Sequence, residues 1–342
     1  LSKYLKISSE KIIYCDHHLS HTLSGVYYNS VNPITSIVID GFGDESTSSI
    51  HHVKSPNEIN NVWSSPFPNS IGLFYSAITD YLGFAVNEGE YKVMGLAAYG
   101  DPIYFDEISK TINFLDGKLS LDTRYYDFCR SINKSYSDKL KDIFKIGERE
   151  SNQNLDLNSP NFKEYADIAA SAQKVVENLL NEIFLYAHRI TNEKRFIFSG
   201  GVAMNSVAIN KLSKLEFVDE IIIPPSPGDS GASIGAAYYG FLKSGNEFIK
   251  NLDISNSGVL TPGLKKNSSN DEEFFLSKYE KICDKNDIVE TASELISSNE
   301  ILATCYKNIE TGPRALGHRS MICNAHSIEA VKNLNENIKK RS

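Results

Sequence analysis

The sequence predicts an α/β fold in which three antiparallel strands lead into alternating helices and strands. Three segments of strand composition, 35–40, 46–54 and 58–64, follow one another across a glycine-rich turn and a short break. From residue 165 onward, long helical patterns alternate with short apolar segments. This alternation is typical of right-handed crossovers, so part of the sheet is expected to be parallel.

The N-terminal region is predicted to contain one strand and one helix. The apolar run 11–15 predicts a short buried strand. Asp16 is a typical helix N-cap, and residues 17–28 follow as a helix. A break at 29–33 separates this helix from the strand at 35–40.

The remaining elements follow from periodicity. Apolar residues at helical spacing predict a helix over 70–84, whereas 88–96 is expected to form a turn that places Lys92 beside small residues. Residues 101–162 are polar and irregular and predict an insertion with short elements of its own. The later expectations are helices at 165–191, 203–215, 231–243 and 287–298, strands at 195–199, 220–223 and 301–306, a linker at 245–271 and a loop at 311–320.

This order of elements is that of one half of the actin/hexokinase/Hsp70-type (ASKHA) nucleotide-binding fold. In that fold, glycine-rich turns face a nucleotide in the cleft between two halves. Residues 1–32 are then expected to be the tail of the first half, and 33–245 the second half. Residues 246–342 would form a linker and the beginning of a further α/β domain.

Composition and charge exclude several classes of protein. The net charge is −8, so a general nucleic-acid-binding surface is not expected, because phosphate binding needs a basic face. No apolar run is long enough to cross a membrane, and residues 1–5 do not have the apolar pattern of a signal-peptide h-region. The five cysteines are spread out without a CxxC motif, which favours a reducing, cytoplasmic environment over disulfides or a cysteine zinc site.

Two histidines and two aspartates are candidate metal ligands. His17 and His21 lie four residues apart, so on a helix their rings share one face and can bind the same ion. Asp40 ends a predicted strand, and Asp229 follows another one in a Pro- and Gly-rich segment. Surface histidines, a solvated hairpin turn and a helix N-cap are the alternatives for these residues. The donor types do not distinguish among iron, zinc and manganese.

Two glycine-rich turns are candidate nucleotide sites. Gly200 and Gly201 follow a predicted strand and precede a helix, so backbone N–H groups and the helix N-terminus are available to an anion. Gly41 and Gly43 form a similar turn after Asp40. Neither segment contains the lysine of a Walker A loop, and ordinary tight turns are the alternative.

Arginines in the segment 312–320 are candidate anion ligands. Arg314 and Arg319 form a compact cationic pair in an otherwise acidic chain. Guanidinium groups bind phosphate or carboxylate with two hydrogen bonds, although a structural salt bridge is the alternative.

Six stretches in order resemble the NodU/CmcH carbamoyltransferase family. They are HHLSH (17–21), DGFGD (40–44), GEYKVMGLAAYG (89–100), SGGVAMNS (199–206), PSPGDSGASIGAA (225–237) and GPRALGHRS (312–320). The similarity runs from about residue 11 to 325 and is weakest in the insertion at 101–162. Six matches in order are far more specific than any one of them.

The resemblance implies a nucleotide-binding domain like that of the tRNA threonylcarbamoyl-transfer protein TsaD, followed by a YrdC-like domain. Members use carbamoyl phosphate and ATP, with Mg²⁺, to form carbamoyl-adenylate, and then pass the carbamoyl group to an acceptor hydroxyl. A hydroxylated small molecule or sugar would be the acceptor, with no DNA and no membrane involved; the oligomeric state stays open.

The resemblance also implies roles for individual residues. His17, His21, Asp40 and Asp229 match the metal site, commonly an iron site, and the two aspartates and Lys92 are the candidate catalytic residues, with Lys92 assigned to phosphate. The adenosine-side loop corresponds to Gly200, Gly201, Val202 and Asn205, and the turn glycines Gly41 and Gly43 are also assigned to the nucleotide. The carbamoyl phosphate ligands correspond to Arg314 and Arg319.

Three departures from the family pattern matter. An early strand-hairpin half is missing, the residues before GPRALG differ at 307–311, and the chain stops at Ser342, early in the YrdC-like domain. We therefore expect a fragment that needs the absent segments for turnover. The alternatives are transfer of threonylcarbamoyl to tRNA, a non-catalytic nucleotide-binding domain, and a sugar kinase.

Overall fold

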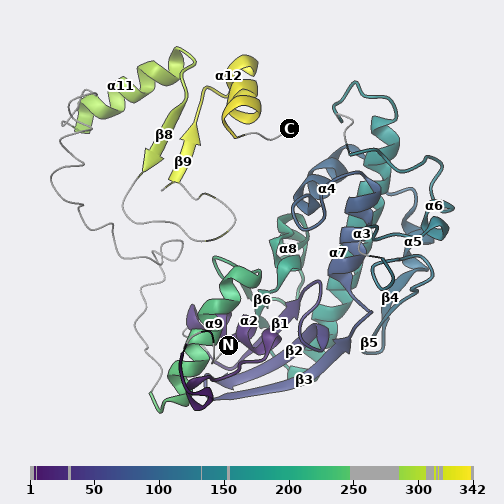
Figure 1. The fold of residues 1–342 in the computed structure, drawn as a ribbon, viewed down its shortest axis with the longest axis vertical. Helices are drawn as coiled ribbons and strands as arrows, with labels where there is room; N and C mark the ends of the chain where they lie inside the picture. The colour runs from purple at the N-terminus through teal and green to yellow at the C-terminus, as the bar shows by residue number, and fades with distance from the viewer. Residues whose placement is uncertain are drawn as a thin grey trace. The chain divides into compact units, whose positions relative to one another are not determined.

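The computed structural model describes residues 4, 6–29, 32–131, 133–151, 155–246, 285–305, 312, 315 and 319–339. The chain divides into two compact units, 1–252 and 253–342 (Figure 1). The first unit contains η1 (Ser9–Lys11), α2 (His17–Tyr27), β1 (Ile34–Ile39), β2 (Ser46–Ser55), β3 (Glu58–Pro66), α3 (Ile71–Tyr81), α4 (Glu90–Leu96), η2 (Ala97–Tyr99), α5 (Phe105–Ser109), β4 (Ile112–Leu115), β5 (Lys118–Leu121), α6 (Asp138–Lys141), α7 (Phe162–Thr191), β6 (Arg195–Ser199), η3 (Gly201–Met204), α8 (Ser206–Leu212), β7 (Glu220–Ile222) and α9 (Asp229–Lys243). The second unit contains α11 (Lys285–Ser297), β8 (Leu302–Cys305), β9 (Arg319–Ile322), α12 (Ile328–Lys332) and η5 (Asn333–Ile338).

The central sheet of the first unit confirms the predicted α/β class. Its strand order is β3-β2-β1-β6-β7. β1, β2 and β3 are antiparallel neighbours, whereas β1 pairs in parallel with β6, and β6 with β7. Ser36 of β1 lies between His51 of β2 and Ile197 of β6, which fixes the register across the sheet. This mixed sheet is compatible with the half-unit predicted from the order of elements.

The two faces of the sheet pack against different helices. The 30-residue helix α7 and α3 cover one face, where Ile37, Ile50 and Phe198 belong to the main apolar core. α2 and α9 cover the other face, and Ile34 and Ile197 belong to the smaller core there (Figure 1). The first residues of α2 and α9 therefore lie near the carboxyl end of β1.

Polar contacts also hold α2 against the sheet. The hydroxyl of Thr22 lies 3.0 Å from both Ser36 Oγ and His51 Nδ1, and all three residues are buried. His18 Nδ1 lies 2.8 Å from Ser49 Oγ. Buried hydrogen bonds are directional, so these contacts fix the rotation of α2 about its axis as well as its position.

Two local predictions were wrong. The run 11–15 does not form a buried strand: the side chains of Ile13 and Tyr14 are exposed, and no described strand pairs with it. An apolar run becomes a buried strand only when a neighbour supplies hydrogen bonds. Residues 88–96 are not a simple turn, because Glu90–Leu96 forms α4, which buries Val93 and Leu96.

The other elements of the first unit agree with expectation. The insertion carries the short elements α5, β4, β5 and α6. In the second unit, β8 and β9 form an antiparallel pair. The linker predicted at 245–271 lies almost wholly outside the described residues. Within the described part of the chain, no helix is both long enough and apolar enough to pass through a lipid bilayer.

Candidate metal centre

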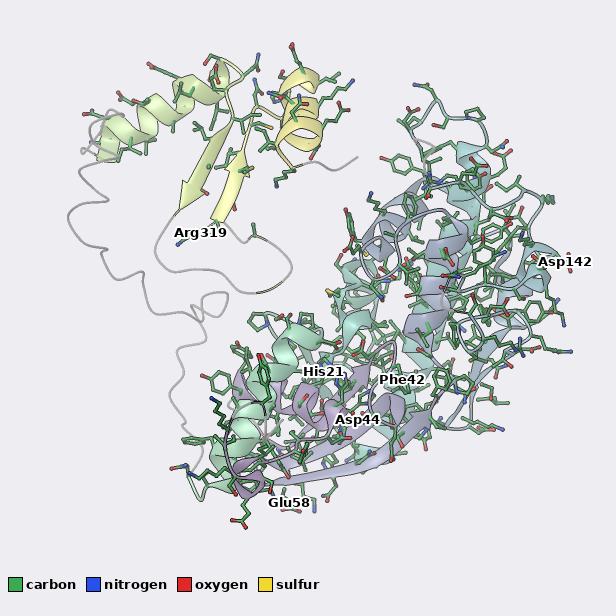
Figure 2. The ribbon with its side chains drawn as sticks, in the orientation of Figure 1. His21, Phe42, Asp44, Glu58, Asp142 and Arg319 are labelled. Carbon is green, nitrogen blue, oxygen red and sulfur yellow. The ribbon has the colours of Figure 1, made fainter. Side chains whose placement is uncertain are left out.

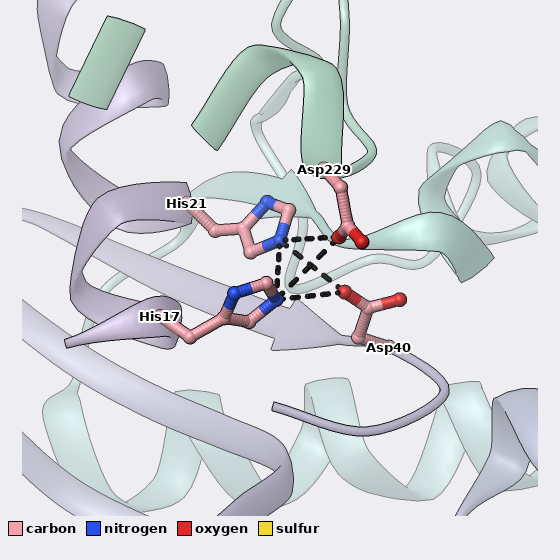
Figure 3. A group of neighbouring side chains, drawn as sticks. All are labelled: His17, His21, Asp40 and Asp229. Carbon is pink, nitrogen blue, oxygen red and sulfur yellow. Dashed lines mark hydrogen bonds and ion pairs between the residues drawn. The ribbon is translucent and has the colours of Figure 1, made fainter. Parts of the chain in front are cut away.

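Four side chains from three distant segments meet at the carboxyl end of β1 (Figure 3). His17 and His21 lie in the first turns of α2, Asp40 directly follows β1, and Asp229 is the first residue of α9. One potential ligand atom from each residue lies within 4.8 Å of all the others. The structure therefore brings together the four residues that the sequence pairs as candidate ligands.

Local sequence explains how α2 presents its two histidines. The carboxylate of Asp16 accepts a hydrogen bond from the backbone N–H of Leu19 at 2.8 Å, which caps the helix and makes His17 its first residue. The four-residue spacing then places the two rings edge to face on one side of the helix, with centroids 4.7 Å apart. Both rings turn their Nε2 atoms toward the carboxylates, and these two nitrogens are 3.2 Å apart.

Five of the six distances between the ligand atoms are close to the edges of a small tetrahedron. Asp40 Oδ2 lies 3.3 Å from His17 Nε2 and 3.2 Å from His21 Nε2. Asp229 Oδ1 lies 3.5 and 3.4 Å from the same two nitrogens. A metal ion with bonds of about 2.0–2.1 Å to four tetrahedral ligands separates those ligands by about 3.3–3.4 Å. Two imidazole nitrogens and two carboxylate oxygens at these spacings fit zinc, iron or manganese.

The charges around the centre favour a cation. Although burial opposes ionisation of Asp40, hydrogen bonds from His17 and His21 outweigh it and hold the pKa of this carboxyl well below its usual range. The hydrogen bond to Asp40 raises the pKa of His17. Partial desolvation and the negative charge of Asp40 raise the pKa of Asp229. Two carboxylates that share one site repel each other, and a bound divalent ion would remove that repulsion.

The centre is buried on one side and open on the other. The side chain of His21 is 1% exposed and that of Asp40 14%, whereas Asp229 is 76% exposed. A reactant can therefore approach the centre from the Asp229 side within this unit.

Asp40 also connects the centre to the glycine-rich turn after β6. Its second oxygen, Oδ1, accepts hydrogen bonds from the backbone N–H groups of Gly41 at 2.8 Å and Gly201 at 3.2 Å. Gly200 has a φ of +88° and lies so close to β1 that a Cβ there would be 2.2 Å from the carbonyl oxygen of Ile39. Only glycine fits that conformation and that space, so the turn and the aspartate form one rigid unit.

The turn at 41–44 covers the histidines closely enough to yield a prediction. A Cβ at Gly43 would lie 3.0 Å from His17 Cδ2 and 2.9 Å from His18 Cδ2. Gly43→Ala should therefore displace both rings and lower zinc affinity about tenfold or more, because small shifts of ligands are costly. Isothermal titration with Zn²⁺ measures this effect.

Gly41→Ala is the matched control for that variant. Its Cβ would meet only Leu73 Cδ2, at an ordinary contact distance of 3.8 Å. Gly41→Ala should therefore bind Zn²⁺ like the unaltered protein. Equal losses in the two variants would contradict the close packing of Gly43 on the histidines.

Of the remaining candidate residues, some lie in the first unit and the two arginines belong to the second. Val202 and Asn205 lie in the turn that leads from β6 into α8. Lys92 lies on α4, a helix that touches the start of α8 through the 3.8 Å contact between Ser206 Oγ and Met94 Sδ. Arg319 begins β9 in the second unit (Figure 2), and Arg314 lies outside the described residues.

Three residues that support the site without being ligands were not predicted from the sequence. Gln173, buried on α7, exchanges two hydrogen bonds with Asn205, and His18 packs beneath the 41–44 turn. Gly235 of α9 packs against the backbone of α2. The only sequence signal for them is negative: a glutamine on the buried face of a helix and a glycine inside a helix are both unfavourable without a specific partner.

Comparisons with known protein families match both parts of the chain. The model of the carbamoyltransferase N-terminus matches residues 1–238, and that of the carbamoyltransferase C-terminus matches residues 293–342. This chain is also 38% identical to the tRNA N6-adenosine threonylcarbamoyltransferase of Lactobacillus delbrueckii subsp. bulgaricus. The match spans 97 residues, which are 27% of this chain and 28% of the relative.

Longer similarities cover nearly the whole chain. The uncharacterized protein sll1178 of Synechocystis sp. is 30% identical over 96% of this chain and 53% of its own length. The nodulation protein NolNO of Sinorhizobium fredii is 27% identical over 98% of this chain and 47% of its own length. The chain thus spans about half the length of these curated relatives. With both family models matched in order, the chain belongs to the carbamoyltransferase family, whose members are enzymes that transfer a carbamoyl group.

Proposed function

We propose that this chain forms part of an ATP-dependent O-carbamoyltransferase. In the proposed reaction, ATP, carbamoyl phosphate and one water molecule give carbamoyl-adenylate, pyrophosphate and inorganic phosphate. The carbamoyl group then passes to a hydroxyl of a small molecule or sugar, and AMP is released. Family membership supports carbamoyl transfer in general. The observation that carries the finer proposal is Asp40, which contacts the two histidines through one oxygen and the glycine-rich turn through the other.

The proposed roles follow from where each group lies. The turn at 200–202 would bind the nucleotide beside Asp40, whose Oδ1 accepts the backbone N–H of Gly201. His17, His21, Asp40 and Asp229 would hold a divalent ion, with iron the first expectation. When bound, such an ion supplies Lewis-acid stabilisation of negative charge that develops in the reaction.

The acceptor and phosphate sides of the reaction use other residues. Asp229 is the most exposed of the four ligand residues, so it is the carboxylate that an entering hydroxyl would meet first. Lys92 is proposed to bind phosphate, and Arg314 and Arg319 are proposed to bind carbamoyl phosphate in a YrdC-like domain.

Metal content tests the proposed centre. The unaltered protein should bind one zinc or iron ion per chain, and His17→Ala/His21→Ala should lose at least about 100-fold in affinity, because two of four ligands are gone. Elemental analysis and titration measure this. His326→Ala, an exposed histidine of the second unit, is the control. A metal-free protein with unchanged nucleotide affinity would instead favour a non-catalytic nucleotide-binding domain.

Product analysis tests the reaction itself. The full-length protein should release pyrophosphate from ATP only when carbamoyl phosphate is present. The phosphate of carbamoyl phosphate should appear as inorganic phosphate, because the adenylate keeps only the carbamoyl group and AMP. Pyrophosphate release without carbamoyl phosphate would point to another reaction.

Similarity to a tRNA threonylcarbamoyltransferase favours one alternative, namely transfer to tRNA. That similarity covers 27% of the chain, and the net charge of −8 opposes binding of a polyanion by this part of the protein. A comparison of tRNA with hydroxylated small molecules as acceptors separates the two functions.

A further inference from the structure

A chain of buried hydrogen bonds runs from the surface of α8 to the glycine-rich turn. It consists of Lys211, Glu177, Gln173 and Asn205, which we call the Asn205 relay. Lys211 Nζ donates to Glu177 Oε2 at 2.5 Å, and Gln173 Nε2 donates to Glu177 Oε1 at 3.1 Å. Gln173 then exchanges two hydrogen bonds with the amide of Asn205, at 3.1 and 2.9 Å.

The charge of Glu177 sets the orientation of every amide in the relay. An ionised carboxylate only accepts hydrogen bonds, so Gln173 must turn its NH₂ group toward Glu177. Gln173 Oε1 then faces the other way, where it accepts from the hydroxyl of Tyr75 at 2.9 Å and from Asn205 Nδ2. Lys211 forms an ion pair with Glu177, whose side chain is only 7% exposed.

The end of the relay controls the backbone of the turn. Asn205 Oδ1 accepts from Ala208 N at 3.1 Å and so caps α8, while the backbone N–H of Asn205 donates to Val202 O at 3.0 Å. Asn205 therefore links the start of α8, through its side chain, to the turn at 200–204, through its backbone. A rotation of the Asn205 amide would break the cap or the pairing with Gln173.

We propose that Gln173 and Glu177 are positioning residues that hold Asn205, and with it the glycine-rich turn, in the geometry that binds ATP. The inference rests on the proposed nucleotide site at this turn. The proposal also explains why α7 has a buried carboxylate. Burying a carboxylate is costly unless it is paired and hydrogen-bonded, and Glu177 is held by both kinds of contact. The nucleotide itself need not touch either residue.

A double-mutant cycle on the full-length protein tests the relay. Glu177→Gln keeps the size of the side chain but removes the charge that orients Gln173, so ATP affinity should fall about tenfold by calorimetry. In an Asn205→Ala background the same change should have no further effect, because its target is gone. Lys211→Met should produce a smaller loss because it removes the ion pair with Glu177. Lys214→Met, just after α8, should produce none, because Lys214 forms no ion pair with any of the described residues.

Thermal unfolding separates positioning from simple stability. If Gln173→Met and Glu177→Gln unfold earlier but bind ATP normally at a temperature where they are folded, the relay only stabilises the core and the proposal is overturned. Equal losses with and without Asn205 also overturn it. ATP binding by the unaltered protein without carbamoyl phosphate-dependent pyrophosphate release would refute the proposed reaction but not the relay, whereas no ATP binding at all would refute both.

Discussion

Replacing Asp40 with asparagine should remove the metal ion and leave the glycine-rich turn in place. Asparagine keeps an oxygen that can accept the hydrogen bonds from Gly41 and Gly201, but it puts a neutral NH₂ group where Oδ2 faces His17 and His21. Zinc affinity should fall at least about 100-fold, since a charged ligand is lost. ATP affinity should change little, and calorimetric titration of each ligand measures both quantities.

Two further variants make this experiment decisive. Asp40→Ala loses both functions of the carboxylate, so it should weaken ATP binding as well as metal binding. Asp44→Asn changes a carboxylate on the same turn that accepts the backbone N–H of His17 at 3.1 Å but is not one of the four ligands. It should bind Zn²⁺ normally. Full zinc affinity in Asp40→Asn would mean that the four side chains form an ion-pair cluster and not a metal site.

Much of this site could be predicted because its parts obey local rules. Asp16 caps a helix, and a four-residue spacing places His17 and His21 on one side of it. Asp40 and Gly200 follow strands that alternate with helices, and the carboxyl ends of parallel strands meet at one edge of a sheet. These relations depend on short stretches and on strand order, which the sequence pattern contains.

The rest could not be predicted because it depends on partners that no local pattern identifies. The run 11–15 has strand composition, but a strand needs a neighbour, and the described sheet provides none for it. α4 has glycine at both ends of its pattern, which lowers helix propensity, yet burial of Val93 and Leu96 in the core outweighs that cost. The hydrogen bonds between Gln173 and Asn205 likewise join segments more than 30 residues apart.

The approach of Asp229 to the histidines depends most on such a distant contact. α9 crosses α2 so closely that a Cβ at Gly235 would lie 1.7 Å from the carbonyl oxygen of Ser20 and 2.8 Å from the backbone nitrogen of Ser24. Gly235 is buried in this contact, and Asp229 begins the same helix six residues earlier. The separation of the two helices thus determines whether Asp229 reaches His17 and His21.

Gly235→Ala should therefore damage the centre without changing any ligand. Restoring an ordinary contact requires the helices to separate by roughly 1.5 Å, because neither backbone can yield to a methyl group. We expect the free energy of unfolding to fall by about 1–3 kcal/mol. Zinc affinity should fall about 10- to 100-fold as Asp229 moves away from the two Nε2 atoms. Chemical denaturation and zinc titration measure the two effects.

Gly240→Ala on the same helix is the control, because it should raise the free energy of unfolding where Gly235→Ala lowers it. A Cβ at Gly240 would meet nothing within 4 Å, so alanine there should stabilise α9 by up to about 1 kcal/mol and leave zinc affinity unchanged. If Gly235→Ala lowers stability but binds zinc as tightly as Gly240→Ala, then Asp229 is not held in place by the contact between α2 and α9.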